Sequence, residues 1–423
     1  MLQVSYIREN KNLVLERLSI KNFSQTHLID EILALDDSRK TMQLEVETLQ
    51  ATANAAAKQV GLLIKTGNYT EAEILKNNTI IVKENSKNLL NNITETEHAL
   101  HQKLVLIPNL PHTSVPKGKS PDDNEVVLSY GDLPNLPENA LPHWEIATKY
   151  NLIDFELGVK ITGAGFPVYK GKGAKLQRAL INFFLAEAEN AGYEELMLPL
   201  LINEASGFGT GQLPDKEGQM YFCEVDNLYL IPTAEVPITN LYRDVLLTHN
   251  ELPIKNCGYT PCFRREAGSY GAHVRGLNRL HQFDKVEIVQ IAQPQNSYQL
   301  LEEMSLHVQS LLQKLGLQYR VLRLCGGDMS FASALTYDME VYSAAQKRWL
   351  EVSSVSNFET FQSNRLKLRY KTTEGKTQLA HTLNGSALAL PRIVAAILEN
   401  FQTPSGINIP ECLHPYIGFK TIS

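Results

Sequence analysis

Apolar side chains recur at a seven-residue spacing along the first hundred residues. Two such series run between residues 32 and 63, and Thr66–Tyr69, which contains a glycine and an asparagine, interrupts them. A weaker series with the same spacing follows from Leu75 to Ile107. Because this spacing places apolar residues along one seam of a helix, it predicts a long antiparallel helical hairpin that turns at Thr66–Tyr69. The first two series are Ile32, Val46, Ala53 and Val60, and Leu35, Met42, Leu49, Ala56 and Leu63.

The rest of the chain has a different pattern. Residues 108–143 are rich in proline, which cannot sustain a helix and therefore predicts a linker. Beyond this segment, strand-like runs such as Lys285–Ile291 alternate with amphipathic helices such as Leu176–Ala191. We therefore expect an α+β fold, with a coiled-coil arm in residues 1–107 and a larger domain in residues 144–423, in which helices pack on an antiparallel β-sheet.

Composition limits the number of domains, the cellular compartment and the partners that the chain can have. With 423 residues and 43% hydrophobic content, the chain is large enough for two domains. Its five cysteines form no C-x-x-C pair, which argues against disulfides and a zinc site. The N-terminus has charges where a signal peptide is apolar, and no apolar run approaches the ~20 residues that span a bilayer. We expect a cytoplasmic protein with no membrane association. The net charge of -6 means that RNA would need a local basic surface.

Two short runs combine arginines, carboxylates and an aromatic side chain. Thr260–Ser269 has the sequence T-P-C-F-R-R-E-A-G-S, and Arg275–Glu287 has the sequence R-G-L-N-R-L-H-Q-F-D-K-V-E. Adjacent arginines alone are typical of a solvated strand. The order of these residues, however, resembles motif 2 of the class II aminoacyl-tRNA synthetases. The particular residues are most similar to those of the bacterial seryl-tRNA synthetases. The resemblance extends over nearly the whole chain. Neither a P-loop nor a Rossmann motif is present, so ATP would need a different kind of phosphate-binding site.

The resemblance implies an ATP site built on motif 2. In the family, the first arginine of this motif contacts the α-phosphate and the reacting carboxylate, which makes Arg264 a candidate catalytic residue. By the same resemblance, Glu266 would accept a hydrogen bond from the adenine amino group, and Phe283 would stack on the adenine. Arg265 and the backbone near Leu280 would border the nucleotide.

A second run, Leu383–Arg392, resembles motif 3 of the same class. Proline followed by arginine opens a predicted helix there, and ordinary capping would explain the pattern if it stood alone. In the family, this arginine binds the γ-phosphate beside a helix N-terminus, so Arg392 is the second candidate catalytic residue. Glycine is common in the family where this chain has Ala387 and Pro391.

A serine-rich strand end provides the candidate magnesium site. Such a sequence is usually only a polar edge. By resemblance, Glu351 and Ser354 instead hold Mg²⁺ and triphosphate oxygens, and Val352 and Ser353 between them border ATP. A hard cation prefers such oxygen ligands. The family often has a pair of arginines a few residues later, where this chain has Ser363–Arg365.

The candidate amino-acid pocket combines the end of a strand, the strand that carries Glu287, and residues of motif 3. Thr233 lies before a predicted helix, where it could simply cap the helix. Glu287 shares a strand face with Val289 and Ile291, so its carboxylate is directed at an interior and needs a partner. A substrate ammonium or hydroxyl would be that partner, and the assignment between the two stays open. The serine-binding candidates are Thr233, Ala234, Glu235, Arg264, Glu287, Asn384 and Ser386.

The resemblance also implies an activity and partners. The activity is ATP-dependent activation of L-serine to seryl-adenylate, followed by transfer to the 3′ end of tRNA(Ser), and to tRNA(Sec) where the host has one. Motif 1 would lie in residues 192–199 and would form a homodimer interface. Residues 1–107 would bind tRNA, and Lys58, Lys65 and Lys76 give the arm a modest positive excess that could meet phosphates.

Other interpretations compete with this one. The arm could be a dimerisation coiled coil. An enzyme of the same fold that loads a carrier protein would lack the long arm, and an inactive RNA-binding scaffold would have no use for Arg264, Glu287 or Arg392. A different amino acid would be discriminated only by the pocket around Glu287 and Ser386. Threonine with a zinc-bound pocket is disfavoured, because no cysteine-histidine cluster has ligand spacing.

Overall fold

The computed structural model describes residues 1–134, 136, 139–215, 218–267 and 275–423. Pro137 of the expected linker, and Gly268 and Ser269 of the arginine-rich run, lie outside the described residues. Within the described part of the chain, no helix is both long and apolar enough to cross a membrane. The chain divides into two compact units, one formed by Met1–Ser19 and Phe23–Pro108, the other by Ile20–Asn22 and Asn109–Ser423.

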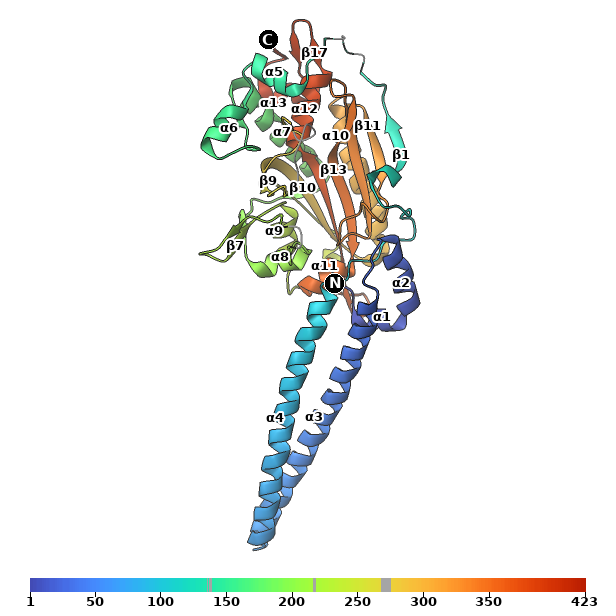
Figure 1. Cartoon of the computed structure of the whole chain (residues 1–423), viewed down its shortest axis with the longest axis vertical. Coiled ribbons are helices and arrows are strands. Elements are labelled where there is room, and N and C mark those ends of the chain that lie inside the picture. Colours follow the sequence, from blue (N-terminus) through green and yellow to red (C-terminus); the bar gives the residue numbers. More distant parts are fainter. Residues whose placement is uncertain (135, 137–138, 216–217, 268–274) are drawn as a thin grey trace. The chain divides into compact units, whose positions relative to one another are not determined.

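The predicted helical hairpin is confirmed in the first unit (Figure 1). Its two long helices are separated at the predicted turn, since α3 ends at Lys65 and α4 begins at Tyr69. Buried residues recur every seven positions on α4, where the seam includes Ala72, Thr79 and Ser86. The apolar pattern missed these three because they are small or polar. The helices before residue 108 are α1 (Val4–Glu9), α2 (Lys11–Ile20), α3 (His27–Lys65) and α4 (Tyr69–Leu104).

A mixed but mainly antiparallel sheet forms the centre of the second unit, which confirms the predicted α+β class. In the described residues it has eight strands in the order β1-β11-β12-β13-β16-β10-β9-β4, and only the β4–β9 pair is parallel. Part of the segment expected to be a linker forms the edge strand β1. The strands are β1 (Glu125–Tyr130), β4 (Glu194–Glu195), β9 (Ile254–Phe263), β10 (Gln282–Ala292), β11 (Tyr319–Arg323), β12 (Leu335–Ser343), β13 (Arg348–Glu359) and β16 (His381–Ala389).

Helices cover the sheet unequally (Figure 1). The main core joins one face of the sheet, through residues such as Ile288, to α7 (Gly171–Asn190), α10 (Ser297–Lys314) and α12 (Leu390–Asn400). On the other face, Val289 packs in a smaller core with Ile238 of α9 (Glu235–Asn240). Because Ile288 and Val289 are adjacent in β10, they point to opposite faces. The face toward α9 therefore has a smaller apolar core than the face covered by α7, α10 and α12.

Shorter elements surround the sheet. The further helices are α5 (His143–Lys149), α6 (Phe155–Ile161), α8 (Glu204–Thr210), α9 (Glu235–Asn240), α11 (Thr360–Leu366) and α13 (His414–Ile417). The further strands are β2 (Ile153–Asp154), β3 (Val168–Tyr169), β5 (Leu201–Ile202), β6 (Phe222–Cys223), β7 (Leu228–Leu230), β8 (Leu246–Thr248), β14 (Arg369–Lys371), β15 (Thr377–Leu379), β17 (Gln402–Thr403), β18 (Gly406–Asn408) and β19 (Thr421–Ile422).

Candidate active site

Strand pairing gathers distant candidate residues on the α9 face of the sheet. Directly opposed residues of antiparallel strands point to the same face. Glu287 of β10 opposes Ser386 of β16, and two positions along, Val289 opposes Asn384. Since Val289 packs toward α9, the polar side chains of Glu287, Asn384 and Ser386 share that face. Residues almost a hundred positions apart in the sequence thus come together on one face, in the candidate amino-acid pocket.

Hydrogen bonds join this wall to the segment before α9. The Thr233 hydroxyl donates to Glu287 Oε2 over 3.2 Å. The Asn384 amide donates both to Glu287 Oε1, at 3.1 Å, and to Glu235 Oε2, at 2.9 Å. Thr233 Oγ1 also accepts the backbone N–H of Glu235 over 3.2 Å. Thr233 therefore makes a local hydrogen bond of the kind expected near a helix start, in addition to its hydrogen bond to Glu287. The structure therefore brings together Thr233, Glu235, Glu287 and Asn384.

The two pocket carboxyls are strongly perturbed by burial. Glu287 is completely buried, and burial raises its pKa despite the cation of Lys285. Burial and the nearby Glu287 raise the pKa of Glu235 to about 7. Two carboxyls in one low-dielectric site disfavour double ionisation unless a cation is present. Lys285 provides one such cation beside Glu287, and the two carboxyls together would also stabilise a positively charged group of a substrate.

Two polar residues of this pocket were not predicted from the sequence. Lys285 is buried, forms an ion pair with Glu287 and donates to Thr233 Oγ1 over 2.9 Å. Gln362 of α11 donates to Glu235 Oε1 over 2.7 Å and accepts from the Thr382 hydroxyl at 2.7 Å. Lys285 had a usable signal, because it lies two residues before Glu287 on the same strand. Nothing in the local sequence marks Gln362.

The end of β9 carries the motif 2 arginines. Arg264 donates through Nε to Pro232 O over 3.4 Å, and its guanidinium lies 5.2 Å from the centre of the Phe283 ring. Arg264 therefore lies between the strand end that precedes Thr233 and the ring predicted to stack on adenine. The side chain of Arg265 is exposed.

Glu266 lies in the segment that follows β9, and Leu280 lies in the segment that precedes β10. Glu266 forms an ion pair with Arg279, in which Arg279 Nη1 lies 2.8 Å from Glu266 Oε2. The side chain of Leu280 is buried in the main core, which leaves its backbone for the nucleotide contact that the sequence suggests. The backbone N–H of Arg264 donates to His281 O over 2.9 Å, so the segments that carry Glu266 and Leu280 lie side by side.

Arg392 connects motif 3 to the turn that precedes β10 and to β13. Its Nε donates to Asn278 O over 3.0 Å, and its Nη1 donates to Glu351 O over 2.5 Å. Nη1 also lies 3.5 Å from Glu351 Oε2. Arg392 is the third residue of α12, which places its cation at the positive end of a helix and favours an anionic partner.

An irregularity in β13 puts Glu351 and Ser354 on one face. Asp338 opposes Ser354 and Glu340 opposes Glu351, with a register shift between the two pairs. Asp338 and Glu340 are two residues apart and share a face, so their partners share it too. Residues three apart in a regular strand would point to opposite faces. The shift at Val352, whose side chain lies in the main core, therefore creates the Glu351–Ser354 pair.

This pair has the donors that magnesium prefers. Among the described residues, no group of three or more His, Cys, Asp and Glu side chains could hold a metal ion. Glu351 and Ser354 nonetheless offer two oxygen ligands on one face, and a nucleotide-bound Mg²⁺ usually takes only one or two protein ligands beside phosphates and water. The residues present fit that cation. Ser353 instead donates to Ser386 O over 2.5 Å and is buried.

Asp338 is a further carboxyl beside this pair. Burial and the nearby Glu351 raise its pKa well above the usual range, and its Oδ1 is buried without a hydrogen-bond partner. The sequence analysis did not identify Asp338, because an aspartate in an alternating strand has no local feature that marks it.

Three residues lie where this chain departs from the motifs common in the family: Arg365, Ala387 and Pro391. Arg365 is buried, where it donates to Phe208 O at 3.2 Å and Leu213 O at 3.1 Å. Its guanidinium also lies 4.7 Å from the Phe208 ring. Arg365 therefore stabilises the packing of α11 on α8. Ala387 and Pro391 are buried in the end of β16 and the start of α12, around Arg392.

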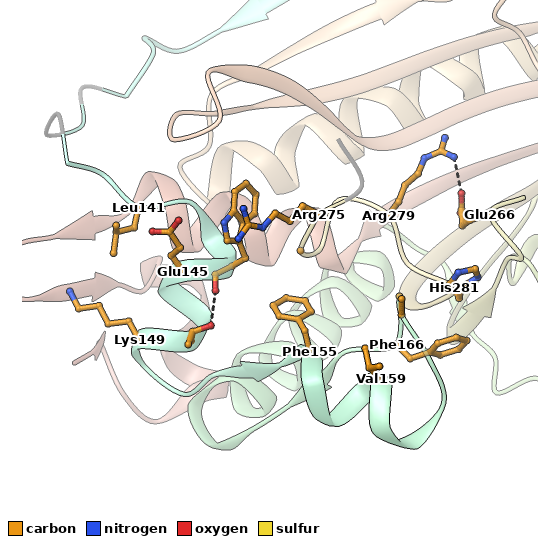
Figure 2. Close-up of a pocket in the computed structure, with 15 residues that line it drawn as sticks. Leu141, Glu145, Lys149, Phe155, Val159, Phe166, Glu266, Arg275, Arg279 and His281 are labelled. Carbon is orange, nitrogen blue, oxygen red and sulfur yellow. Dashed lines mark hydrogen bonds and ion pairs between the residues drawn. The ribbon is translucent and has the colours of Figure 1, made fainter. Parts of the chain in front are cut away.

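A cavity of about 800 Å³ borders the motif 2 residues. Figure 2 shows the Glu266–Arg279 pair at one end, with His281 and Phe166 beside it and Phe155 and Val159 of α6 below. The lining is mainly apolar, and Arg275 and Lys149 add positive charge. Because Glu266 and Arg279 belong to both, the cavity is continuous with the candidate nucleotide site.

Comparisons with known proteins agree with this geometry. The family model described as "Seryl-tRNA synthetase N-terminal domain" matches residues 1–111, and "tRNA synthetase class II core domain (G, H, P, S and T)" matches residues 221–401. The chain is 49% identical to a serine--tRNA ligase of Salinibacter ruber over 424 residues, covering 100% of this chain and 99% of that protein. The chain belongs to the seryl-tRNA synthetase family. Its activity is that of a serine–tRNA ligase, an ATP-dependent class II aminoacyl-tRNA synthetase.

Other relatives support this assignment across distant organisms. The serine--tRNA ligase of Akkermansia muciniphila is 46% identical, covering 100% of this chain and 99% of that protein. The crystal structure of seryl-tRNA synthetase from Pyrococcus horikoshii complexed with ATP superposes with a TM-score of 0.94 at 31% identity, covering 100% of this chain and 99% of that chain. The cytoplasmic enzyme of Naegleria fowleri, in complex with AMP, gives a TM-score of 0.89 at 27% identity, with the same coverage of both chains. Serine, ATP and tRNA are accordingly the substrates.

Proposed function

We propose that the residues gathered on the α9 face divide the reaction of a serine–tRNA ligase among themselves. The observation that carries this proposal is the position of Arg264, between the pocket of Thr233 and Glu287 and the ring of Phe283. Adenylate formation brings two anions together, the serine carboxylate and the α-phosphate. A guanidinium between them offsets their repulsion and the charge that develops in the transition state. No covalent nucleophile is required, and catalysis is positioning and charge neutralisation.

The nucleotide would occupy the space between motif 2 and motif 3. Phe283 stacks on the adenine, Glu266 accepts from its amino group, and Arg392 binds the γ-phosphate at the start of α12. Arg264 now faces the Phe283 ring at 5.2 Å, so a stacked purine requires this guanidinium to turn toward the phosphates. Glu266 must likewise share or leave its ion pair with Arg279.

Glu351 and Ser354 would hold Mg²⁺ bound to the triphosphate. Their shared face and their oxygen ligands support this role. When bound, the cation neutralises phosphate charge as pyrophosphate leaves. Arg392, which contacts the Glu351 carbonyl, connects this ligand to the γ-phosphate site.

Different residues of the serine pocket would bind the hydroxyl and the ammonium of the substrate. Glu287 is the fully buried carboxylate and opposes Ser386, so we assign it to the hydroxyl, which is the deepest part of the substrate. Thr233 and Glu235 then face the ammonium, while Arg264 faces the carboxylate. A pocket with committed polar groups rejects alanine strongly, on the order of 10⁴-fold in favourable cases, because their partners would be missing.

The first unit would bind the tRNA. We assign tRNA binding to residues 1–107 and catalysis to residues 144–423, with residues 108–143, which include the edge strand β1, connecting the two. Lys58, Lys65 and Lys76 are exposed on α3 and α4, as contacts to a phosphate backbone require. Recognition of backbone shape rather than bases fits a helical surface, and tRNA(Sec) would be a second substrate where the host has it.

A homodimer would cover the edge of the sheet near β4. Met197 in the motif 1 segment is 96% exposed and Leu201 is 43% exposed, although both lie in the apolar run Leu196–Leu201. A second copy packed on this edge would bury them. We place the enzyme in the cytoplasm, where its tRNA substrates are.

Substitution of Arg264 tests the central assignment. Arg264→Lys keeps the charge but loses the planar fork, so we expect serine-dependent exchange of pyrophosphate into ATP to fall by at least about 100-fold. Arg178→Lys is the matched control, since Arg178 is exposed on α7. Equal activity of both variants would contradict the proposed role of Arg264.

A further inference from the structure

His143 is a completely buried histidine at the start of α5 that the proposed mechanism does not use. Its ring Nδ1 lies 2.7 Å from Glu399 Oε1, and its ring Nε2 accepts the backbone N–H of Leu277 over 2.8 Å. A backbone N–H can only donate, so Nε2 is unprotonated. The proton of the neutral ring is therefore on Nδ1, which donates it to Glu399. The two hydrogen bonds fix one tautomer and one ring orientation.

Glu399, on α12, is held as firmly as the histidine. It accepts hydrogen bonds from the hydroxyl of Ser343 and, over 3.0 Å, from the Gln346 amide. Burial alone would raise its pKa, but the hydrogen bonds from His143 and Ser343 outweigh burial and lower it. Glu399 is thus a buried carboxylate with its acceptors satisfied. It is a rigid support for His143.

The peptide that His143 holds belongs to the nucleotide site. Leu277 is followed by Asn278, whose carbonyl accepts Arg392 Nε over 3.0 Å. The Asn278 side-chain amide also donates to Gln346 over 3.0 Å, so this segment has a second connection to the network of Glu399. A shift of the Leu277–Asn278 segment would move the carbonyl that orients the Arg392 guanidinium.

Two neighbouring features show that this segment is fitted closely to α5. A Cβ added at Gly276, whose φ is +70°, would lie 2.2 Å from His143 Nε2, so only glycine permits the approach. The guanidinium of Arg275 lies 4.8 Å from the ring centre of Trp144, the residue after His143. Figure 2 shows Arg275 directed toward α5 from this segment.

We propose that His143 is a positioning residue for ATP: by accepting the Leu277 backbone N–H, it holds the Leu277–Asn278 segment, whose Asn278 carbonyl orients Arg392 toward the triphosphate. The proposal rests on the assignment of Arg392 to ATP. A buried histidine that only stabilises the fold would affect stability without selectivity for one substrate. A positioning role instead predicts a loss of ATP affinity with serine affinity unchanged.

Two substitutions of His143 separate its two hydrogen bonds. In His143→Asn, the amide can reach Glu399 in place of Nδ1, but it is too short to accept the Leu277 N–H. In His143→Gln, the amide oxygen can reach the position of Nε2 and accept that N–H. We expect the ATP Kd, measured by calorimetry without serine, and the ATP KM to rise on the order of tenfold in His143→Asn, the equivalent of one lost hydrogen bond. In His143→Gln both should stay within about threefold, and serine KM should change in neither.

Controls distinguish this inference from its premises. His381→Asn alters another buried histidine, which contacts Ser297 rather than the motif 2 segment, and should lower the Tm without changing the ATP Kd. Arg392→Ala must weaken ATP binding; if it does not, the assignment of Arg392 fails. If Arg392→Ala weakens ATP binding and His143→Asn does not, only the inference about His143 fails.

A further variant covers the case in which His143→Asn does not fold. Gly276→Ala places a methyl against His143 Nε2 and should reproduce the rise in the ATP Kd. An unchanged ATP Kd in folded Gly276→Ala, or an equal loss of serine and ATP affinity in it, would overturn the proposal.

Discussion

Replacement of Glu287 by glutamine tests the chemistry of the serine pocket. The substitution keeps the shape of a completely buried side chain and removes its charge. If Glu287 meets the substrate hydroxyl, the variant loses one charge-assisted hydrogen bond, which is equivalent to about 1.5–3 kcal/mol. This corresponds to a fall of roughly 10- to 150-fold in kcat/KM for serine. For alanine, which has no hydroxyl, kcat/KM should stay within about threefold.

A second effect of the substitution must be separated from the first. Lys285 has a side chain only 6% exposed and loses its ionic partner when Glu287 is neutral. Breaking a buried ion pair from one side typically destabilises a protein by about 3–5 kcal/mol. Addition of Lys285→Met removes the unpaired cation. The double variant should therefore regain thermal stability while its selectivity for serine over alanine stays low.

The assay is exchange of labelled pyrophosphate into ATP, run with serine and with alanine at saturating ATP. Equal losses for serine and alanine would show that Glu287 holds the ammonium, which both substrates carry. Unchanged serine kinetics in a folded variant would remove Glu287 from the pocket altogether. Either result would refute the assignment of Glu287 to the hydroxyl.

Other predictions follow from the same site and from the arm. With its pKa near 7, Glu235 is about one-tenth ionised at pH 6 and about nine-tenths at pH 8, so serine KM should fall by about tenfold over that range, and Glu235→Gln should abolish the fall. Glu351→Gln should raise the Mg²⁺ concentration needed for half-maximal exchange by roughly tenfold, with serine KM unchanged. Combined replacement of Lys58, Lys65 and Lys76 by glutamate should raise the KM for tRNA and leave pyrophosphate exchange intact; an effect on exchange would contradict separate roles for arm and site.

The sequence predicted the hairpin because its signal is local and repeated. The heptads of α3 and the turn before Tyr69 fixed the positions of both helices within a few residues. On α4 the pattern was weaker, because Thr79 and Ser86 occupy seam positions that a longer apolar side chain would usually fill. Small and polar residues are compatible with a close helix pair, but they give no hydrophobic signal.

The site was predicted by resemblance, whereas its geometry depends on long-range pairing. The contact of Asn384 with both Glu235 and Glu287 requires the register between β10 and β16, which no local pattern specifies. The register shift at Val352 is equally hidden, since strict alternation predicts opposite faces for Glu351 and Ser354. Motif residues can be recognised one by one, but supporting residues such as His143 become visible only when the chain is folded.

The central claim is that this site activates serine and no other amino acid. The most direct test is amino-acid-dependent exchange of labelled pyrophosphate into ATP with each of the twenty amino acids, in the presence of Mg²⁺ and without tRNA. The account predicts exchange with serine alone. Exchange with a different amino acid would contradict the pocket assignment, and no exchange by folded protein with any amino acid would contradict the proposed catalytic roles of Arg264 and Arg392.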